Sequence, residues 1–315
     1  MKKISFLLII LVYFSSTKIV AQTMTDGIMM PKKNLCTGLI YNYDAWGKYW
    51  EGTLLRENKN IGTHTTQSVS WMAAYGITNK ITAIVGLPYV WTKNSAGTLS
   101  GQSGVQDFSA AVKYNPLNIK FLRTDFSVDA LIGASVPVNN YVADLQPMSI
   151  GMKCKTAFAR AILCLHHENN FGVSAQASYI YRHNILIDRT SYFTTRQIYS
   201  NEVAMPDMVF LSARAGYYSY RWAAEATFEQ INCTSGHDIR RNDMPFPSNN
   251  MDQTRIGFLG HYRFSSLRDL QLVLSFSHVT SGRNVGQSNA FSVALMKNFD
   301  FSGTSSKPSA ASKIL

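Results

Sequence analysis

Residues Ile81–Trp91, with the sequence ITAIVGLPYVW, place apolar or aromatic side chains at every second position. Successive side chains of an extended strand point to opposite faces, so Ile81, Val85 and Tyr89 share one face. Residues 124–137 and 171–182 repeat this period of two. Such segments predict strands longer than the roughly 5–6 residues that are usual in soluble proteins.

Twelve segments of this kind follow one another between residues 33 and 301. They begin near Lys33, His64, Lys80, Val105, Thr124, Lys153, Phe171, Asp207, Arg221, Gln253, Leu270 and Asn289. Their connections alternate between short, as at 219–220, and long, as at 184–206. Outer-membrane barrels combine an even number of antiparallel strands with short periplasmic turns and longer external loops. The sequence therefore predicts an all-β, transmembrane, antiparallel up-and-down barrel of about 12 strands over residues 33–301.

The amino-acid composition excludes some classes of protein and disfavours others. The chain is 46% hydrophobic and 12% aromatic, which excludes a disordered protein. A soluble β-sandwich or soluble barrel remains the alternative fold, but aromatic residues such as Tyr75, Trp91 and Trp222 gather at strand ends, as in the girdles of membrane barrels. The net charge is +11, yet Arg240-Arg241 is the only arginine pair, and no nucleic-acid signature is present.

The two ends of the chain differ from the barrel. Residues 1–21 combine a basic start with an apolar run from Phe6 to Phe14, which predicts a cleaved signal peptide. Residues 22–32 then form a short N-terminal segment, and residues 302–315 form a polar C-terminal tail. A secreted barrel implies location in the outer membrane of a Gram-negative-type cell, in contact with lipid and lipopolysaccharide. Lys153 and Lys155 are the candidate lipopolysaccharide contacts at the external rim.

If the apolar faces meet lipid, the opposite faces line a lumen. Strand parity then places a balanced set of charged and histidine side chains inside. The candidates are Asp44, Asp107, Lys113, Asp125, Asp129, Arg160, Arg182, Arg214, Glu225, Glu229, Arg255, His261 and Arg263. Either these groups pair with one another and help to close the lumen, or they form a ladder that lines a substrate path. Apolar inward positions such as Ile84 and Leu131 would suit a hydrophobic substrate.

The four cysteines also fall on the inward face. Cys36 and Cys164 are expected near the periplasmic rim, and Cys154 and Cys233 near the outer rim. Disulfides Cys36–Cys164 and Cys154–Cys233 are topologically possible, but they require short separations between Cα atoms. Unpaired buried thiols are the default expectation.

No catalytic or cofactor-binding pattern is present. His278 points outward, but the nearest hydroxyls by register are Thr254 and Thr280, whereas a membrane phospholipase needs a serine. His166-His167-Glu168 reads as a solvated turn rather than a metal site, and Gly282–Gly286 joins two strands and opens no helix, so it is not a phosphate loop. We therefore expect no enzyme activity, cofactor or metal.

Several stretches resemble the outer-membrane barrels named for the meta-pathway of phenol degradation, which are distant relatives of fatty-acid and aromatic-hydrocarbon transporters. The matching stretches are Asp26–Pro31, Tyr75–Lys80, Val85–Val90, Gly104–Phe108 and Ser281–Gly286. The resemblance implies uptake or efflux of small, often hydrophobic molecules. Residues 22–32 are too short for the sizeable N-terminal plug of the larger fatty-acid transporters, so a plug-gated lateral exit does not carry over.

We accordingly expect a monomeric barrel that passes a small hydrophobic or aromatic molecule passively through its lumen. The alternative is a closed structural or surface-interaction barrel whose long loops, 184–206 and 234–252, meet a partner. Within the second loop, residues Asn242–Asn250 could fold inward as a constriction or outward as a binding tip.

Overall fold

The fold is described here from a computed structural model of the chain. The structure describes residues 23–241, 243–264 and 270–302. The expected signal peptide, the bulk of the polar tail and Asn242 therefore lie outside the described residues.

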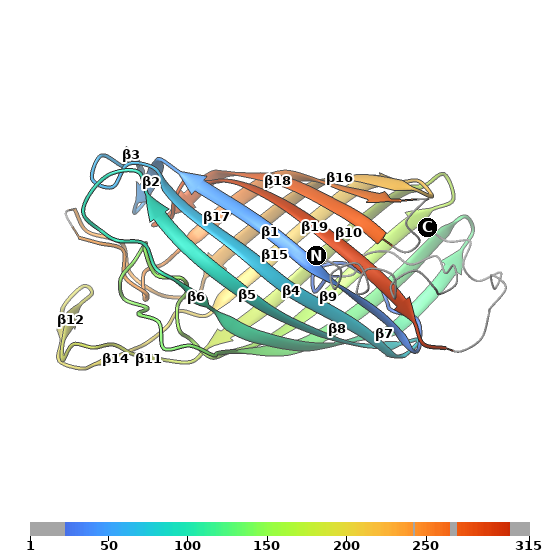
Figure 1. The fold of residues 1–315 in the computed structure, drawn as a ribbon, viewed down its shortest axis with the longest axis horizontal. Helices are drawn as coiled ribbons and strands as arrows, with labels where there is room; N and C mark the ends of the chain where they lie inside the picture. The colour runs from blue at the N-terminus through green and yellow to red at the C-terminus, as the bar shows by residue number, and fades with distance from the viewer. Residues whose placement is uncertain (1–22, 242, 265–269, 303–315) are drawn as a thin grey trace, which may run out of the picture.

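Twelve long strands form one closed antiparallel barrel (Figure 1). They are β1 (Asn34–Trp46), β4 (His64–Thr78), β5 (Ile81–Asn94), β7 (Asp107–Phe121), β8 (Thr124–Pro137), β9 (Thr156–His167), β10 (Phe171–Arg182), β15 (Met208–Tyr218), β16 (Trp222–Cys233), β17 (Asp252–Arg263), β18 (Leu270–Arg283) and β19 (Asn289–Asp300). Each strand pairs with its neighbour in sequence, and β1 pairs with β19 from Asn34↔Asp300 to Ala45↔Asn289. This pairing leaves no open sheet edge and confirms the predicted twelve-stranded barrel.

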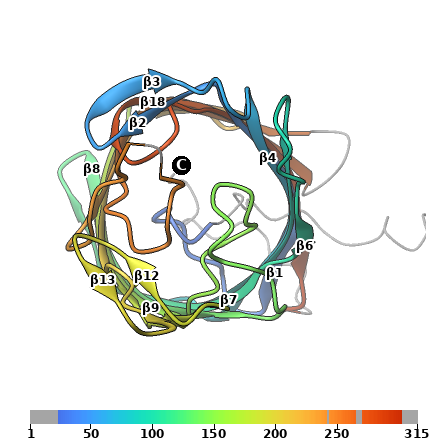
Figure 2. The ribbon, with the colours of Figure 1, turned by 90° about the vertical axis from the view of Figure 1, so that its left-hand side faces the viewer.

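The two ends of the barrel differ. At the turn end, where both chain termini enter the sheet, the strands are joined by short connections such as 122–123 and 168–170. At the loop end the connections are long and carry small ribbons of their own (Figures 1 and 2). These ribbons are β2 (Lys48–Glu51) with β3 (Leu54–Glu57), β11 (Ile185–Leu186) with β14 (Glu202–Val203), and β12 (Tyr192–Phe193) with β13 (Gln197–Ile198), while β6 (Ser103–Val105) adds to β5.

The predicted strand starts hold to within a few residues, and the largest difference has a local cause. The strand expected from Lys153 begins instead at Thr156, as β9. Lys153 has a φ of 52°, and its backbone N–H donates to the Tyr141 hydroxyl at 2.7 Å. Lys153 therefore belongs to the preceding loop.

The period of two separates an apolar outer face from an inner face. Outward side chains in mid-strand are large and exposed: Phe258 is 70% exposed and Ile132 is 66% exposed. Inward side chains include Lys113 and Asp129, both fully buried. A continuous exposed apolar surface with buried charges is the reverse of a soluble protein, and it is the arrangement that lipid requires of a barrel.

The described residues contain no helix that is long and apolar enough to cross a membrane.

Replacing Phe258 by arginine tests the outer face. Phe258 lies in the middle of β17, so we expect a loss of about 2–4 kcal/mol in the free energy of unfolding from lipid vesicles. Leu122, which is 82% exposed in a turn-end connection, is the control, and Leu122→Arg should cost about 1 kcal/mol or less. Equal effects of the two substitutions in denaturant titrations would contradict the assignment of the outer face to lipid.

Candidate functional site

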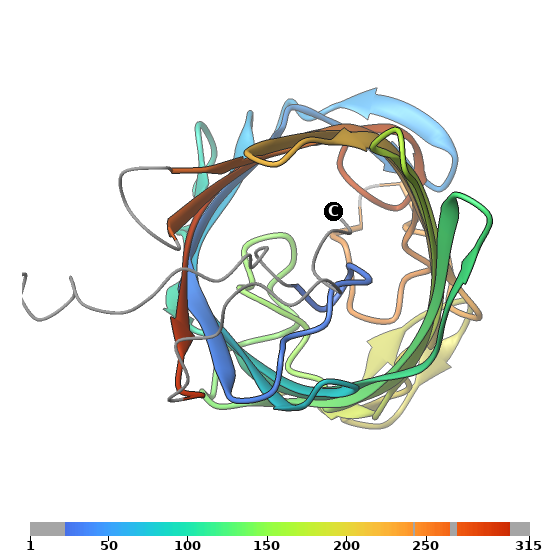
Figure 3. The ribbon, with the colours of Figure 1, turned by 90° about the vertical axis from the view of Figure 1, so that its right-hand side faces the viewer.

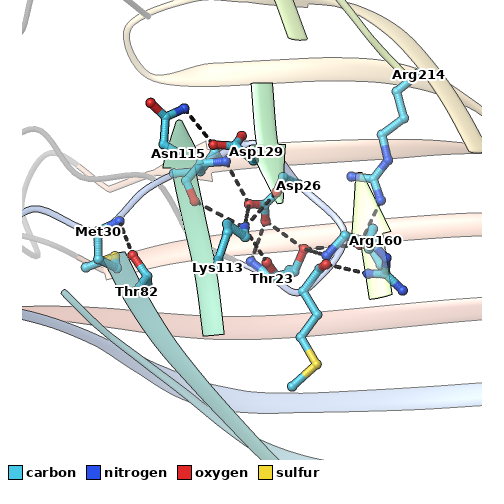
Figure 4. Close-up of polar contacts among 12 residues, drawn as sticks. Thr23, Asp26, Met30, Thr82, Lys113, Asn115, Asp129, Arg160 and Arg214 are labelled. Atoms are coloured by element: carbon cyan, nitrogen blue, oxygen red, sulfur yellow. Dashed lines mark hydrogen bonds and ion pairs between the residues drawn. The ribbon is translucent and has the colours of Figure 1, made fainter. Parts of the chain in front are cut away.

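The N-terminal segment, residues 23–32, enters the lumen at the turn end (Figure 3). It follows an irregular path without strand pairing, so its backbone polar groups need partners from the wall. Inward side chains of β5, β7, β9 and β15 supply them (Figure 4). The segment thus bridges strands on different sides of the barrel.

Lys113 of β7 is the principal anchor. Its ammonium donates to the backbone oxygens of Thr23 at 3.0 Å, Asp26 at 2.7 Å and Ile28 at 3.2 Å. It also forms an ion pair with Asp26 Oδ1 at 3.2 Å. A fully buried ammonium is tolerated only when its charge is compensated in this way, so Lys113 and the segment depend on each other.

Asp26 also shapes the segment locally. Its carboxylate accepts hydrogen bonds from the backbone N–H of Ile28 at 3.0 Å and from the Thr23 hydroxyl at 2.6 Å, and it accepts a further bond from the Thr23 N–H. Aspartate favours such turns because its short side chain reaches backbone groups two to three residues away. The segment is therefore compact before it meets the wall.

Two arginines contact the far side of the segment. Arg160 of β9 donates to the backbone oxygen of Met24, and its Nε donates to Ser178 at 2.6 Å. Arg214 of β15 donates to the Thr25 hydroxyl at 2.9 Å. Three cationic side chains thus hold the segment, largely through its backbone oxygens.

Close packing completes the fit. A Cβ atom on Gly27 would lie 2.1 Å from Cys164 Sγ, so only glycine passes this point without displacement. Met30 is fully buried and packs with Met72, Ile84 and Leu131 on the apolar part of the inner wall. Its backbone N–H donates to Thr82 at 3.2 Å. The segment is thereby fixed by apolar packing at one end and by charged side chains at the other.

Residues 22–32 are expected to be too short for the sizeable plug of the larger fatty-acid transporters, and their described part, residues 23–32, forms only a short insertion. This part of the chain is only about ten residues long, but it lies inside the turn end of the lumen and contacts the wall there. It needs no internal core, because Lys113 and Arg160 satisfy its backbone oxygens directly and Arg214 donates to the Thr25 hydroxyl.

Lys113→Met should release the segment and raise the single-channel conductance of the barrel. Removing one partner of a buried charge pair costs about 3–5 kcal/mol, which we expect to be lost from the docking of the segment. Lys120→Met is the matched control, because Lys120 is exposed and pairs with Glu168 at the rim. An unchanged conductance in folded Lys113→Met protein would show that the segment does not limit flow.

All thirteen charged or histidine residues expected in the lumen lie on inward positions of their strands. The structure places them at Asp44, Asp107, Lys113, Asp125, Asp129, Arg160, Arg182, Arg214, Glu225, Glu229, Arg255, His261 and Arg263. Glu225 and His261 pair with each other, with 3.5 Å between Oε1 and Nε2. Glu229 and Arg255 are direct cross-strand neighbours. The inner wall is therefore polar over β9, β10 and β15–β17, opposite the apolar part that holds Met30.

Mutual pairing of these groups, one of the two expectations, describes only part of the wall. Lys113, Arg160 and Arg214 contact the N-terminal segment instead of wall carboxylates. Asp129 accepts a hydrogen bond from Asn115 at 2.7 Å. Asp107 accepts one from the Tyr141 hydroxyl at 2.7 Å. The physical reason is that irregular segments inside the lumen, and for Asp129 the neighbouring strand β7, offer nearer partners than the opposite wall.

All four cysteines lie in the described residues and are free thiols. Cys36, Cys154 and Cys164 are buried, and Cys233 is half-buried. Burial raises the pKa of the Cys154 thiol to about 11, which keeps it protonated and unreactive. The two topologically possible disulfides are not formed.

At the loop end, residues 138–155 and 243–251 fold inward across the mouth of the barrel (Figure 2). The first loop is tied to the wall by Thr92, whose hydroxyl donates to the backbone oxygen of Met148 at 2.7 Å. The second buries Phe246, which stacks on Tyr192 with 5.3 Å between ring centroids. The described part of the loop 242–250 is therefore an inward constriction and not an outward tip.

Tyr141 fastens the first loop. Burial, together with the Asp107 carboxylate, raises the pKa of the Tyr141 hydroxyl, so it stays protonated and donates to Asp107. The same oxygen accepts from the Lys153 N–H. One phenol thus joins both ends of the loop to β7.

Asn284 fastens the second loop and the hairpin β2–β3. Its Oδ1 accepts from the backbone N–H groups of Gly52 and Ile239, both at 2.9 Å. Its Nδ2 donates to Asp238 Oδ1 and to the backbone oxygen of Asn250, both at 2.8 Å. Asp238 in turn accepts two hydrogen bonds from Arg283, which lower the pKa of its carboxyl. The long loops are therefore held in one arrangement.

The Asn284→Ala substitution should increase the mobility of the loops at the mouth of the barrel. The buried N–H groups of Gly52 and Ile239 would lose their acceptor, at a cost of about 1–3 kcal/mol each. Hydrogen exchange at these two amides should accelerate, whereas exposed Asn140→Ala, the control, should leave them unchanged. Unaltered protection in Asn284→Ala would mean that the loops are held by other contacts.

Among the described residues, no group of three or more His, Cys, Asp or Glu is placed to hold a metal ion. His278 lies outside the lumen and hydrogen-bonds Asn289 at 2.9 Å. The His166 ring packs edge-on against Tyr218, with 4.9 Å between centroids.

Sequence reasoning missed the residues that act from outside the strands. In the sequence, Asp26, Gly27 and Asn284 stand out only as members of stretches that resemble the barrel family. The sequence carries two signals: an Asp-Gly pair before the first strand, and an asparagine, a residue type that tolerates a positive φ, between Gly282 and Gly286. In the structure the φ of Asn284 is 55°. Local patterns do not reveal the distant partners of such residues.

No family model matches the sequence, and no curated protein matches it. Among solved structures, the fold is similar to an outer membrane channel from Pseudomonas putida F1, with a TM-score of 0.71, 11% identity, and coverage of 88% of this chain and 100% of that chain. The NanC porin gives a TM-score of 0.47 with 9% identity over 82% and 98% of the two chains. The CymD monoaromatic hydrocarbon channel gives 0.40 with 13% identity over 91% and 95%. The first of these likenesses establishes the fold as that of an outer-membrane barrel.

Proposed function

We propose that the protein is an outer-membrane channel that passes a small hydrophobic or aromatic molecule passively through its lumen. The observation that carries the proposal is a closed barrel narrowed from both ends by segments of its own chain. Barrels of 16–18 strands leave wide aqueous channels, whereas about eight strands leave room for side chains alone. Twelve strands with two constrictions suit a solute of limited size.

The inner wall supports the choice of solute. Met72, Ile84, Leu131 and Met296 make an apolar patch beside Met30, and most of the charged side chains lie on β9, β10 and β15–β17. Because acids and bases are balanced along the wall, the lumen has no ring of one sign that would select ions strongly. The thirteen inward charged and histidine residues are thus proposed to line the route.

We also propose membership of the family named for the meta-pathway of phenol degradation. Three of the stretches of this chain that resemble the family have identifiable contacts in the structure. Asp26–Pro31 belongs to the N-terminal segment inside the lumen, and Tyr75–Lys80 contacts that segment, since Lys32 N donates to Asn79 Oδ1 at 2.9 Å. Ser281–Gly286 contains Asn284, which fastens the mouth.

The remaining proposals concern the surroundings of the barrel. As the sequence predicts, we propose that residues 1–21 are removed as a signal peptide and that the barrel is a monomer in the outer membrane. In this arrangement the loop end is external and the turn end is periplasmic. Lys155, exposed beside the external rim, is the proposed lipopolysaccharide contact, together with Lys153.

The refolded protein in a planar bilayer tests the function directly. We expect small ion steps that are reduced by benzyl alcohol, and uptake of benzyl alcohol into vesicles that is faster with the barrel than without it. Absence of both conductance and uptake from a folded barrel would contradict the proposal. That outcome would favour a closed surface-interaction barrel, whose protruding arm 183–207 exposes Tyr199 and Leu186.

A further inference from the structure

The mouth of the barrel contains a cavity that is separate from the N-terminal segment. It has a volume of about 280 Å³ and lies between the inward loops, the hairpin β2–β3 and the loop-end residues of β1 and β4. Trp46, Tyr49 and His64 form its aromatic wall, with 5.2 Å between the ring centroids of Trp46 and His64. Ile150, Met152 and Met251 are among the residues that complete it.

Among the residues that the structure describes, the lining of this cavity carries no aspartate, glutamate, lysine or arginine. Its one titratable side chain besides Tyr49 is His64, and both ring nitrogens of His64 contact neutral groups, Asn94 Oδ1 at 2.8 Å and Thr66 Oγ1 at 3.2 Å. The Asp44 carboxylate lies outside the lining and interacts with Arg255 and with His64. An anionic ligand in the cavity would lose its hydration without gaining a cationic partner from the lining, which is unfavourable.

The shape of the cavity is fixed by its surroundings. A Cβ atom on Gly286 would lie 2.4 Å from the Trp46 ring, so the ring packs directly on the backbone at this glycine. Asn284, which lines the cavity, makes four hydrogen bonds that join three chain segments. A preformed cavity binds without a large ordering cost.

We propose that this cavity is a binding site for an uncharged aromatic molecule of one or two rings, with at most a hydroxyl-sized polar group. A dry cavity of about 150 Å³ holds benzene, so the larger cavity here admits a substituted ring. Ser149 and Gln146 in the lining provide polar atoms for a hydroxyl group, and the aromatic wall provides ring contacts. The inference deepens the proposed function by placing a selective site at the external entrance.

Calorimetric titration of the refolded barrel in detergent micelles tests the site, with benzyl alcohol and benzoate as a neutral and an anionic probe of equal ring size. Empty micelles supply the blank. The site predicts saturable binding of benzyl alcohol and at least about tenfold weaker binding of benzoate. Met251→Lys, which places one charge in the cavity, should weaken benzyl alcohol binding by at least about tenfold.

Met244→Lys is the matched control, because Met244 is exposed in the same loop and does not line the cavity. It should bind benzyl alcohol as the unmodified protein does. If Met251→Lys does not fold, Met152→Trp fills the cavity without a charge and should abolish binding. Equal affinity for benzoate, or retained binding in either folded cavity variant, would overturn the inference.

These experiments distinguish a failure of the proposed binding site from a failure of the proposed channel. A barrel that binds benzyl alcohol in micelles but passes neither ions nor solute retains the site and refutes the channel. A barrel that conducts without saturable binding retains the channel and refutes the site.

Discussion

The buried ammonium of Lys113 is the interaction on which the lumen depends. A fully buried positive charge on a strand wall would be costly unless oxygens surround it, and here the N-terminal segment provides four of them. In return, Lys113 satisfies backbone oxygens of a segment that has no strand partner. The charge and the segment are therefore each stable only in the presence of the other, and the turn end of the lumen is narrowed as a consequence.

The inner wall of the barrel has an apolar part and a charged part, and this division determines how the N-terminal segment is placed. One part is apolar and receives Met30, while β9, β10 and β15–β17 carry most of the charges. At the opposite end, Tyr141 and Asn284 hold two loops across the mouth through hydrogen bonds to neighbouring segments. A solute would thus meet a neutral aromatic cavity first, then a polar wall, then the N-terminal segment. This order supports the proposal that the solute is a small uncharged molecule.

The sequence predicted the strands and their faces, which depend on a local period of two. It did not predict contacts between residues that are far apart in the chain. Alternation in Ile81–Trp91 and its repeats was sufficient for the barrel, because one side of every strand must meet lipid and the other the lumen. The same parity placed Lys113 and Arg160 on the inward face. It did not provide their partners, because Asp26 is 87 residues from Lys113 in the chain and lies in irregular structure. Asn284 was missed for the same reason.

The placement of the N-terminal segment against β9 is the central claim, and a cysteine cross-link tests it most directly. A Cβ atom at residue 27 would lie 3.5 Å from the Cβ of Cys164, within the range of disulfides. The account predicts that the Gly27→Cys variant, folded and mildly oxidised, gives a 27–164 disulfide in mass spectra, and that Cys164→Ser removes it. A folded Gly27→Cys barrel whose residue 27 remains a free thiol, or pairs equally with Cys36, would contradict the account.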